Sequence, residues 1–383
     1  MKKVPLHKPY WGFKEIFQVI KTILLKKGGG GGPFGELVEK KICELLNIKF
    51  AFLCNSGTSA LEMSLMALNL SDGFEAILPA FTFVSTANAV VRERGIPVFV
   101  DIEETTYNID TKLIEKKITK KTKVIIPVHY AGVGCKMDEI LAISKKYNLF
   151  VIEDAAHAFG SKYKTKYLGT FGDLGCYSFH ITKNLTCGEG GCCVTDNEEL
   201  AEIIETIRDK GTDRQKFLRK EVSEYKWVSK GSNFLMSDIL AGILYQQINR
   251  LNKINKLRRK KAIYLWEKLK NEIREEIILP ELNEFKESNW HIFAIRVKNE
   301  EYRNKLIEYL NKKGIQASFH YLPLHLSPFV QKNYNYKPGD FPITELVAKT
   351  LIRIPLYPQI SYREINYIVK SIKEGIYKIK HDK

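Results

Sequence analysis

The sequence lacks an apolar run long enough to cross a membrane. The nearest candidate, "IFQVIKTILL" from Ile16 to Leu25, is short and is interrupted by Lys21, so we expect an amphipathic helix there. The first residues, "MKKVPLHKPYWGF", also lack the continuous apolar segment and the small-residue cleavage site of a signal peptide. The sequence therefore predicts a cytoplasmic protein with no membrane contact.

Cysteines are few and lack the spacing of a disulfide framework or a metal site. Their number, seven, is odd, which favours a reducing compartment. Cys187, Cys192 and Cys193 lie close together, but adjacent side chains on a strand point to opposite faces and no paired CxxC is present. We expect these cysteines to be structural and expect no metal.

Acidic residues are too few to balance the basic ones. The 60 Lys and Arg residues exceed the 44 Asp and Glu residues and give a net charge of +16, which raises nucleic acid as a partner. The lysines are spread along the chain, as in "KKITKKTK", and are interleaved with acidic residues. We predict no nucleic-acid partner and keep a basic regulator as a remote alternative. A positive field would also attract an anionic small substrate.

Short apolar runs alternate with amphipathic helical stretches between about residues 34 and 195. The runs "FAFLC", "EAILP", "KVIIPV", "LFVIEDA" and "LGCYSF" are typical of buried strands. This alternation predicts an α/β protein with a mostly parallel central sheet, whose ligands bind at the carboxyl ends of the strands. Residues 212–233 show little periodicity and are expected to form a long ordered loop.

The length of 383 residues predicts two domains. A long helical stretch is expected over about residues 237–271, and strands are expected near "NWHIFAIRV" and "IQASFH". We place the boundary inside the helix, near residue 250. The prediction is a large domain over residues 1–250 and a smaller C-terminal α+β domain over residues 251–383.

A run of five glycines opens the segment "GGGGGPFGE". Gly30, Gly32 and Gly35 satisfy GxGxxG, but a dinucleotide-binding fingerprint must follow a strand, and the preceding "FKEIFQVIKTILLKK" is helical. No GK[ST] follows for a phosphate-binding loop of the Walker type. A flexible linker and a loop near an active site both remain open.

The segment "NSGTSALEMSLMAL" places small residues between a strand and a helix. The amides of Gly57, Thr58 and Ser59 are expected at the helix N-terminus, where backbone donors and the helix dipole favour a phosphate. Ordinary N-capping by Ser56 or Thr58 explains the same residues. Both interpretations remain open on this segment alone.

Two carboxylates close the apolar strand in "FVIEDAAHAFG". Glu153 or Asp154 could ligate a metal, orient His157 or pair with a cationic ring nitrogen. Lys183 follows a later strand, and a lysine with a lowered pKa there can form a Schiff base with a carbonyl, whereas most loop lysines simply face solvent. The order of phosphate-binding turn, carboxylate and lysine is what pyridoxal phosphate requires.

Nine motifs resemble the DegT-type sugar aminotransferases, which are pyridoxal-phosphate enzymes of the aspartate aminotransferase fold (fold type I). They are "SGTSALEM", "PAFTFVSTANAVV", "PVHYAGVGCKMDEI", "FVIEDAAHA", "YSFHITKN", "GEGG", "RDKGTDR", "GSNFLMSDI" and "FHYLPLH". The resemblance spans nearly the whole chain. It implies that fold and pyridoxal 5′-phosphate as the cofactor.

The resemblance also implies the roles of the cofactor site. Lys183 would hold the cofactor covalently, and Asp154 would pair with the protonated ring nitrogen, which lets the ring accept electrons. Phe83 would stack on the ring, and His157 would contact its phenolic oxygen. The phosphate would be held by Gly57, Thr58, Ser59, Ser178 and, from a second subunit, Asn233. A homodimer with shared active sites follows.

Five further residues would face a nucleotide sugar by the same resemblance, with ordinary packing as the alternative for each: His129, Tyr130, His320, Tyr321 and His325. The implied reaction moves an amino group from glutamate to the 4-keto group of dTDP-4-keto-6-deoxyglucose and gives dTDP-4-amino-4,6-dideoxygalactose for a cell-surface polysaccharide. A 3-amino or a gluco-configured 4-amino product is the alternative. Lys183 argues against the lysine-free sugar dehydratases of this fold.

Overall fold

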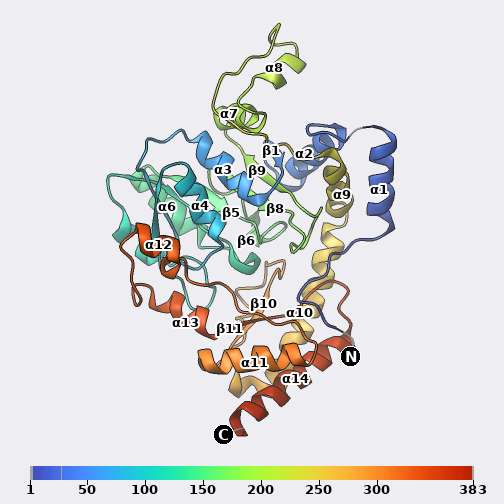
Figure 1. Cartoon of the computed structure of the whole chain (residues 1–383), viewed down its shortest axis with the longest axis vertical. Helices are drawn as coiled ribbons and strands as arrows, with labels where there is room; N and C mark the ends of the chain where they lie inside the picture. Colours follow the sequence, from blue (N-terminus) through green and yellow to red (C-terminus); the bar gives the residue numbers. More distant parts are fainter. Residues whose placement is uncertain (1–2, 27, 382–383) are drawn as a thin grey trace.

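The computed structural model describes residues 3–26 and 28–381 and contains a seven-stranded sheet in the order β1-β9-β8-β5-β4-β2-β3 (Figure 1). Its strands are β1 (Phe50–Cys54), β2 (Glu75–Pro79), β3 (Ile96–Val100), β4 (Thr122–Ile125), β5 (Phe150–Asp154), β8 (Leu174–Ser178) and β9 (Gly191–Thr195). Neighbours from β8 to β3 pair in parallel, and β9 runs antiparallel to both β1 and β8. The prediction of a mostly parallel central sheet is confirmed.

Helices cover both faces of this sheet. They are α2 (Pro33–Leu46), α3 (Gly57–Ala67), α4 (Val84–Arg92), α5 (Thr111–Ile114), α6 (Met137–Tyr147), α7 (Glu198–Arg208) and α9 (Asp238–Ile248). Alternate strand residues enter different cores. Cys193 packs in the core beneath α3, α4 and α7, whereas Cys192 packs in the core beneath α2 and α9. The adjacent cysteines therefore face opposite sides of β9, and both are buried and free.

The C-terminal part is built on a second, two-stranded sheet. Its elements are α10 (Leu251–Ile273), β10 (Phe293–Arg296), α11 (Glu300–Lys312), α12 (Pro328–Asn333), α13 (Pro342–Thr350), β11 (Leu351–Ile354) and α14 (Tyr362–His381). The prediction of a strand near "IQASFH" is wrong, because Ile315 and Ser318 form only isolated bridges. The strand that pairs with β10 is β11, and the two run antiparallel. Figure 1 shows α11 and α14 on the far side of this pair from the large sheet.

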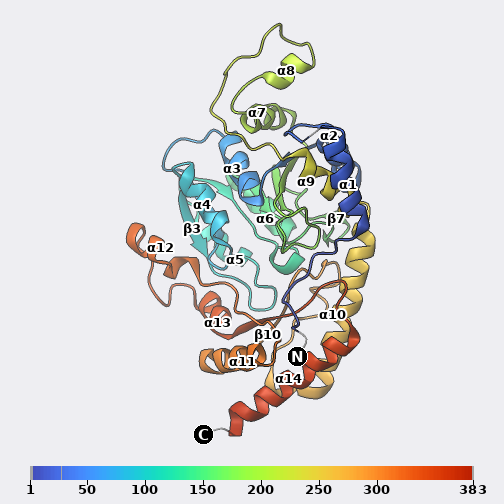
Figure 2. The same cartoon turned by 45° about the vertical axis from the view of Figure 1, so that its right-hand side comes forward.

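The long helix expected over residues 237–271 is two helices. The first ends at Ile248 and the second begins at Leu251, so the break falls where the domain boundary was expected. We propose that the two domains divide there. Val4, near the start of the described residues, nevertheless belongs to the C-terminal core, since it is buried there and bridges to Ile315. Figure 2 shows α1, at the other end of this segment, beside α9 of the large domain.

Helix α1 (Phe13–Leu24) is packed with its polar face inward. Glu15, Gln18 and Thr22 are its buried residues, and Glu15 accepts a hydrogen bond from the side chain of Gln247 on α9 at 2.7 Å. Its apolar residues point outward, with Phe13 79% exposed. The exposed stripe comprises Phe13, Ile16, Phe17, Ile20, Ile23 and Leu24. The predicted amphipathic helix is present, but its apolar face is uncovered. No helix among the described residues is long and apolar enough to span a membrane.

The glycine run is a packed connection to α2. The carbonyl of Gly29 accepts a hydrogen bond from the amide of Asp238, and the hydroxyl of Ser237 donates to the carbonyl of Gly28. A Cβ on Gly30 would lie 2.6 Å from the Cβ of Leu235. The described glycines therefore run close against the segment before α9, which does not fit a free linker.

The expected loop over residues 212–233 contains a short helix, α8 (Arg214–Leu218). The segment projects beyond the large sheet in both views (Figures 1 and 2). Trp227 within it is 82% exposed. The remaining short elements are β6 (Lys162–Tyr163), β7 (Lys166–Tyr167) and 3-10 turns at Glu115–Lys117, Tyr130–Gly132, Arg274–Glu276 and Leu324–Leu326.

Candidate active site

The polar residues predicted from the sequence follow strands that end at one edge of the large sheet. The turn before α3 follows β1, Asp154 is the last residue of β5, and Lys183 follows β8. These strands run in the same direction, because β5 pairs parallel with β8 and the antiparallel β9 separates β8 from β1. Their carboxyl ends therefore meet where an α/β sheet binds its ligands.

The turn between β1 and α3 combines a helix cap with a group of small residues. Ser56 caps α3 by accepting the amide of Ser59 at 3.0 Å, so the N-capping interpretation holds for Ser56. A Cβ on Gly57 would lie 2.7 Å from the Cβ of Ser178, so these residues are in contact and only glycine fits. The hydroxyl of Thr58 lies 2.8 Å from that of Ser85. The helix N-terminus thus gathers hydroxyls and amides suited to a phosphate.

Two further predicted phosphate residues lie at the same turn. The hydroxyl of Ser59 donates to the side-chain oxygen of Asn55 at 2.5 Å. The side-chain amide of Asn55 in turn donates to the carbonyl of Asn233 at 3.3 Å. Asn233 therefore lies alongside this turn of its own chain, at the start of the segment that leads into α9.

Asp154 is a buried carboxylate held by two donors. It is 5% exposed, and its Oδ2 accepts the hydroxyl of Thr86 at 2.8 Å while its Oδ1 accepts the amide of Ala156 at 3.1 Å. Burial raises the pKa of Asp154, whereas the two hydrogen bonds and the charge of Lys183 lower it. The donors therefore support the anionic form that a cationic ring nitrogen requires.

Lys183 is half-buried beside this carboxylate. Burial lowers its pKa to about 8, Asp154 opposes that shift, and the charge of Arg353 lowers the pKa further. A lysine with such a pKa is neutral in an appreciable fraction of molecules near neutral pH. It can then act as a nucleophile toward a carbonyl and as a base.

His157 presents a proton toward the same space. Its Nδ1 accepts the amide of Ala131 at 3.3 Å, so the ring proton belongs on Nε2, which lies 3.3 Å from the hydroxyl of Tyr321. Burial holds the pKa of His157 well below its usual value, and the charge of Lys183 acts in the same direction. The imidazole is therefore neutral and offers one N–H to a ligand oxygen.

Aromatic side chains form one wall of the site. The ring of Phe83 is 55% exposed, and its centroid lies 6.2 Å from that of Tyr321. The hydroxyl of Tyr130 lies 3.0 Å from Nδ1 of His320, whose ring lies 6.2 Å from that of His157. The structure thus brings Phe83, Tyr130, His320 and Tyr321 together around His157.

The imidazoles of two predicted substrate residues are enclosed by other side chains, although the amide of His129 donates to the carbonyl of Asp154. His129 is fully buried, with Nε2 2.8 Å from Glu153 and Nδ1 accepting the amide of Cys135. His325 is also fully buried, with Nε2 3.1 Å from Glu345 and its ring against Phe341. Neither imidazole is exposed, which favours the packing alternative for both residues. Glu153 is likewise structural, because it also accepts the amides of Gly169, Phe171 and Gly172.

Three residues near the site were not identified from the sequence. The hydroxyl of Thr86 donates a hydrogen bond to Asp154. Thr86 stands about one helical turn after Phe83 in "FTFVST", and this spacing was the sequence feature that could have identified it. Arg353 was detectable as a single charge in the apolar strand "LIRI". Glu189, which had no assigned role, has an exposed side chain whose carboxylate lies 3.4 Å from Nε2 of His180.

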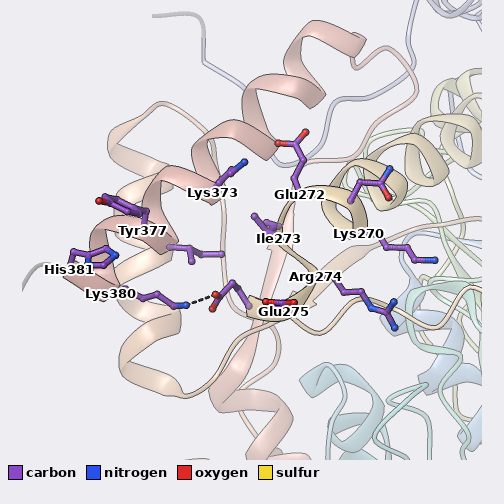
Figure 3. A pocket seen from close by; sticks show the side chains of 12 residues that line it. Lys270, Glu272, Ile273, Arg274, Glu275, Lys373, Tyr377, Lys380 and His381 are labelled. Atoms are coloured by element: carbon purple, nitrogen blue, oxygen red, sulfur yellow. Dashed lines mark hydrogen bonds and ion pairs between the residues drawn. The ribbon is translucent and has the colours of Figure 1, made fainter.

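A surface pocket lies away from these residues, in the C-terminal part of the chain. A pocket of about 620 Å³ lies between the end of α10 and α14, where lysines alternate with glutamates (Figure 3). Lys380 forms an ion pair with Glu276 there. Among the described residues, no group of three or more His, Cys, Asp or Glu side chains could hold a metal ion.

The residues at the sheet edge fit pyridoxal 5′-phosphate. Lys183 suits its aldehyde, the buried carboxylate of Asp154 suits its ring nitrogen, and the turn at Gly57 suits its phosphate. The exposed face of Phe83 suits its ring, and the N–H of His157 suits its phenolic oxygen. When bound, the cofactor supplies an electron sink for carbanion chemistry next to an amino group.

The chain matches a known family over nearly its whole length. The DegT/DnrJ/EryC1/StrS aminotransferase family covers residues 13–373. The chain is 41% identical over 378 residues to uncharacterized protein MJ1066 of Methanocaldococcus jannaschii, with 97% of each chain covered. It is 34% identical over 379 residues to the spore coat polysaccharide biosynthesis protein SpsC of Bacillus subtilis, covering 97% of this chain and 96% of that relative.

Solved structures agree with the family match. PseC of Helicobacter pylori, an aminotransferase involved in the biosynthesis of pseudoaminic acid, is 26% identical with a TM-score of 0.90, covering 98% of this chain and 100% of that chain. The PLP form of Spr1654 from Streptococcus pneumoniae is 28% identical with a TM-score of 0.90, covering 99% and 100%. This chain therefore belongs to the DegT/DnrJ/EryC1/StrS aminotransferase family, and the protein is a sugar aminotransferase that uses pyridoxal 5′-phosphate.

Proposed function

We propose that the protein moves an amino group from glutamate to the 4-keto group of dTDP-4-keto-6-deoxyglucose, giving dTDP-4-amino-4,6-dideoxygalactose for a cell-surface polysaccharide such as the lipopolysaccharide O-antigen or enterobacterial common antigen. The observation that carries the chemistry is the amine of Lys183, with a pKa of about 8, beside the buried carboxylate of Asp154. The printed names of SpsC and PseC support a sugar destined for a polysaccharide or a sugar acid. The substrate and product themselves rest on the sequence motifs.

The residues of the chain divide the work of the two half-reactions. Lys183, as a free amine, would take a proton from the amino-bearing carbon of the donor and return one to the acceptor carbon in the second half. Asp154 would keep the ring nitrogen protonated, and the N–H of His157 would stabilise negative charge on the phenolic oxygen. Phe83 would orient the ring and exclude water. One amine therefore serves as nucleophile and as base.

Tyr130, His320 and Tyr321 are proposed to face the sugar nucleotide. They lie beside His157, and His320 and Tyr321 are only half-buried, which leaves part of each side chain available. Hydroxyl and imidazole groups can donate to sugar hydroxyls and to phosphate oxygens. The cluster therefore supplies polar contacts next to the catalytic lysine.

We also propose a homodimer in which the exposed side chain of Asn233 reaches the phosphate site of the other subunit, while its carbonyl keeps the contact with Asn55 of its own chain. Two exposed apolar surfaces support it: the outward stripe of α1 and the projecting segment that carries Trp227. Contiguous exposed apolar surface of this kind marks an interface. Both surfaces adjoin the residues around Asn233, because α1 packs on α9 and the projecting segment runs directly into Asn233.

Product analysis tests the reaction. The holoenzyme is incubated with dTDP-4-keto-6-deoxyglucose and glutamate, and the amino sugar is examined by NMR. An axial amino group at carbon 4 is expected. An equatorial amino group, or an amino group at carbon 3, would replace the proposal by the corresponding alternative product. Steep salt-dependent DNA binding by a protein without cofactor absorbance would instead favour the regulator weighed from the net charge.

A further inference from the structure

We propose that His291 is a positioning residue for the cofactor site: its ring packs against the imidazole of His157, and the side chain of Asn184 holds it there. The inference rests on the proposed role of His157 at the phenolic oxygen of the cofactor and names the residue that gives this role its geometry. His291 lies outside the nine motifs. It belongs to residues 288–291, the linking segment, which lies shortly before β10 in the C-terminal part.

The rings of His291 and His157 are in direct contact. Their centroids lie 4.5 Å apart and their planes are tilted by 42°, which is within the range of favourable aromatic pairs. The ring of Tyr130 lies 5.8 Å from that of His157, and the ring of His320 lies 6.2 Å from it. His291 is also buried, so solvent does not compete for the contact. His291 therefore restricts the tilt of the His157 ring more closely than Tyr130 and His320 do.

The side chain of Asn184 fixes the orientation of His291. Its nitrogen donates to the carbonyl of Asn289 at 3.0 Å, so its oxygen is left as an acceptor. This oxygen lies 3.1 Å from Nδ1 of His291, which therefore carries the ring proton. Burial holds the pKa of His291 well below its usual value. The ring that packs on His157 is thus neutral and has one defined tautomer.

The linking segment also holds the backbone and the proton of His157. The side-chain nitrogen of Asn289 donates to the carbonyl of His157 at 3.0 Å. The amide of His291 donates to the carbonyl of Ala131 at 3.2 Å, and the amide of Ala131 donates to Nδ1 of His157 at 3.3 Å. That last bond leaves the ring proton on Nε2. The segment therefore determines both where the imidazole lies and which of its nitrogens can donate.

Asn184 connects this arrangement to the catalytic lysine. It directly follows Lys183, and its side chain bonds to Asn289 and to His291. The two proposed cofactor residues Lys183 and His157 are thereby tied to each other through one segment of the C-terminal part. Hydrogen bonds weaken steeply when they are misaligned. An imidazole that was free to tilt would therefore stabilise negative charge on the phenolic oxygen less well.

The test is the visible absorbance of the cofactor in the holoenzyme as a function of pH. A donor to the phenolic oxygen favours the deprotonated form of the bound cofactor, so a weaker donor should raise the pH of the absorbance transition. His291→Asn keeps an amide that can donate to Asn184 but removes the outer edge of the ring. The transition should rise by about one pH unit, and the Kd of the cofactor should rise about tenfold.

Two further variants separate the ring from the stability of the segment. His291→Phe restores a ring and should show less than half of the shift seen in His291→Asn. Phe285→Leu is the matched control, because the ring of Phe285 packs on Trp290 of the linking segment with the same centroid distance of 4.5 Å. It should lower the melting temperature and leave the absorbance transition unchanged.

Each outcome decides the proposal. An unchanged transition in His291→Asn would overturn it, as would a shift of equal size in His291→Phe or in Phe285→Leu. If His291→Asn does not fold, His291→Gln, which also lacks the ring, replaces it with the same expected result. Failure of the proposed function is distinguished by His157→Asn. An unchanged transition there removes the role of His157 and the inference with it, whereas a shift in His157→Asn without one in His291→Asn removes the inference alone.

Discussion

Replacing Thr86 by valine removes one hydroxyl from the buried carboxylate of Asp154 and keeps the shape of the side chain. The hydroxyl donates to Oδ2 at 2.8 Å, and Asp154 is 5% exposed, so water cannot readily replace it. A hydrogen bond to a charged group contributes about 1.5–3 kcal/mol. At about 1.4 kcal/mol per factor of ten, this corresponds to roughly a ten- to hundredfold effect. The loss raises the pKa of Asp154 in the same direction as burial does.

The expected result is a ten- to hundredfold slower donor half-reaction, because a less stable carboxylate anion holds the ring nitrogen protonated less well. The rate is followed by stopped-flow absorbance of the cofactor. Asp154→Asn should bind cofactor and lose most turnover, and Thr86→Val in that background should cost less than about threefold. Thr82→Val is the comparison: its hydroxyl lies 3.0 Å from that of Thr86, which in turn donates to Asp154, so its loss should slow the half-reaction less than Thr86→Val does. Equal losses from Thr86→Val in both backgrounds would refute the role of Thr86.

Three further predictions follow from Lys183 and from α1. Borohydride should trap the cofactor on Lys183, and Lys183→Ala should abolish both the trapped adduct and turnover; transamination at the parent rate would contradict the assignment. In the cofactor-free protein, burial disfavours the protonated amine of Lys183 and lowers its pKa to about 8. The free energy of unfolding is therefore reduced below a pH of about 8, and it rises as the pH approaches 10.5, the ordinary pKa of a lysine. Lys183→Met should therefore be more stable than the parent to urea at pH 7, by about 1–3 kcal/mol, with a gap that closes above pH 10. Phe17→Asp on the exposed stripe of α1 should shift the oligomer toward monomer in light scattering, whereas Lys14→Asp should not.

The sequence already indicates the proposed catalytic groups because each follows a buried strand. The apolar runs fix the strands, and parallel strands place the residues after them at one edge, so Gly57, Asp154 and Lys183 needed no knowledge of distant contacts. The sequence alone does not show which of the adjacent carboxylates, Glu153 or Asp154, is structural. Side chains alternate along β5, so Glu153 and Asp154 face opposite ways, and only the amides and the imidazole around Glu153 show which of the two is structural.

The sequence does not reveal the role of a residue whose contacts come from distant parts of the chain. His129 and His325 stand in motifs that also contain proposed site residues, but the imidazoles of His129 and His325 lie within hydrogen-bond distance of Glu153 and Glu345. Arg353 reaches the site from a strand far along the chain from Lys183, so no local pattern connects the two. The motifs therefore indicate aminotransferase chemistry, whereas the surroundings of His129, His325 and Arg353 are visible only in the fold.

Helix α1 shows the same limit at the level of packing. Its periodicity predicts an amphipathic helix, but a pattern alone does not say which face is covered. Here the polar face is inside, because Glu15 and Gln18 find partners in the side chains of Gln247 and Gln246 on α9. Exchanging those partners for apolar contacts would leave buried polar groups unpaired, so the orientation is fixed by hydrogen bonds. The apolar face is then left exposed, and in the proposed homodimer a second copy would cover it beside α9 and Asn233.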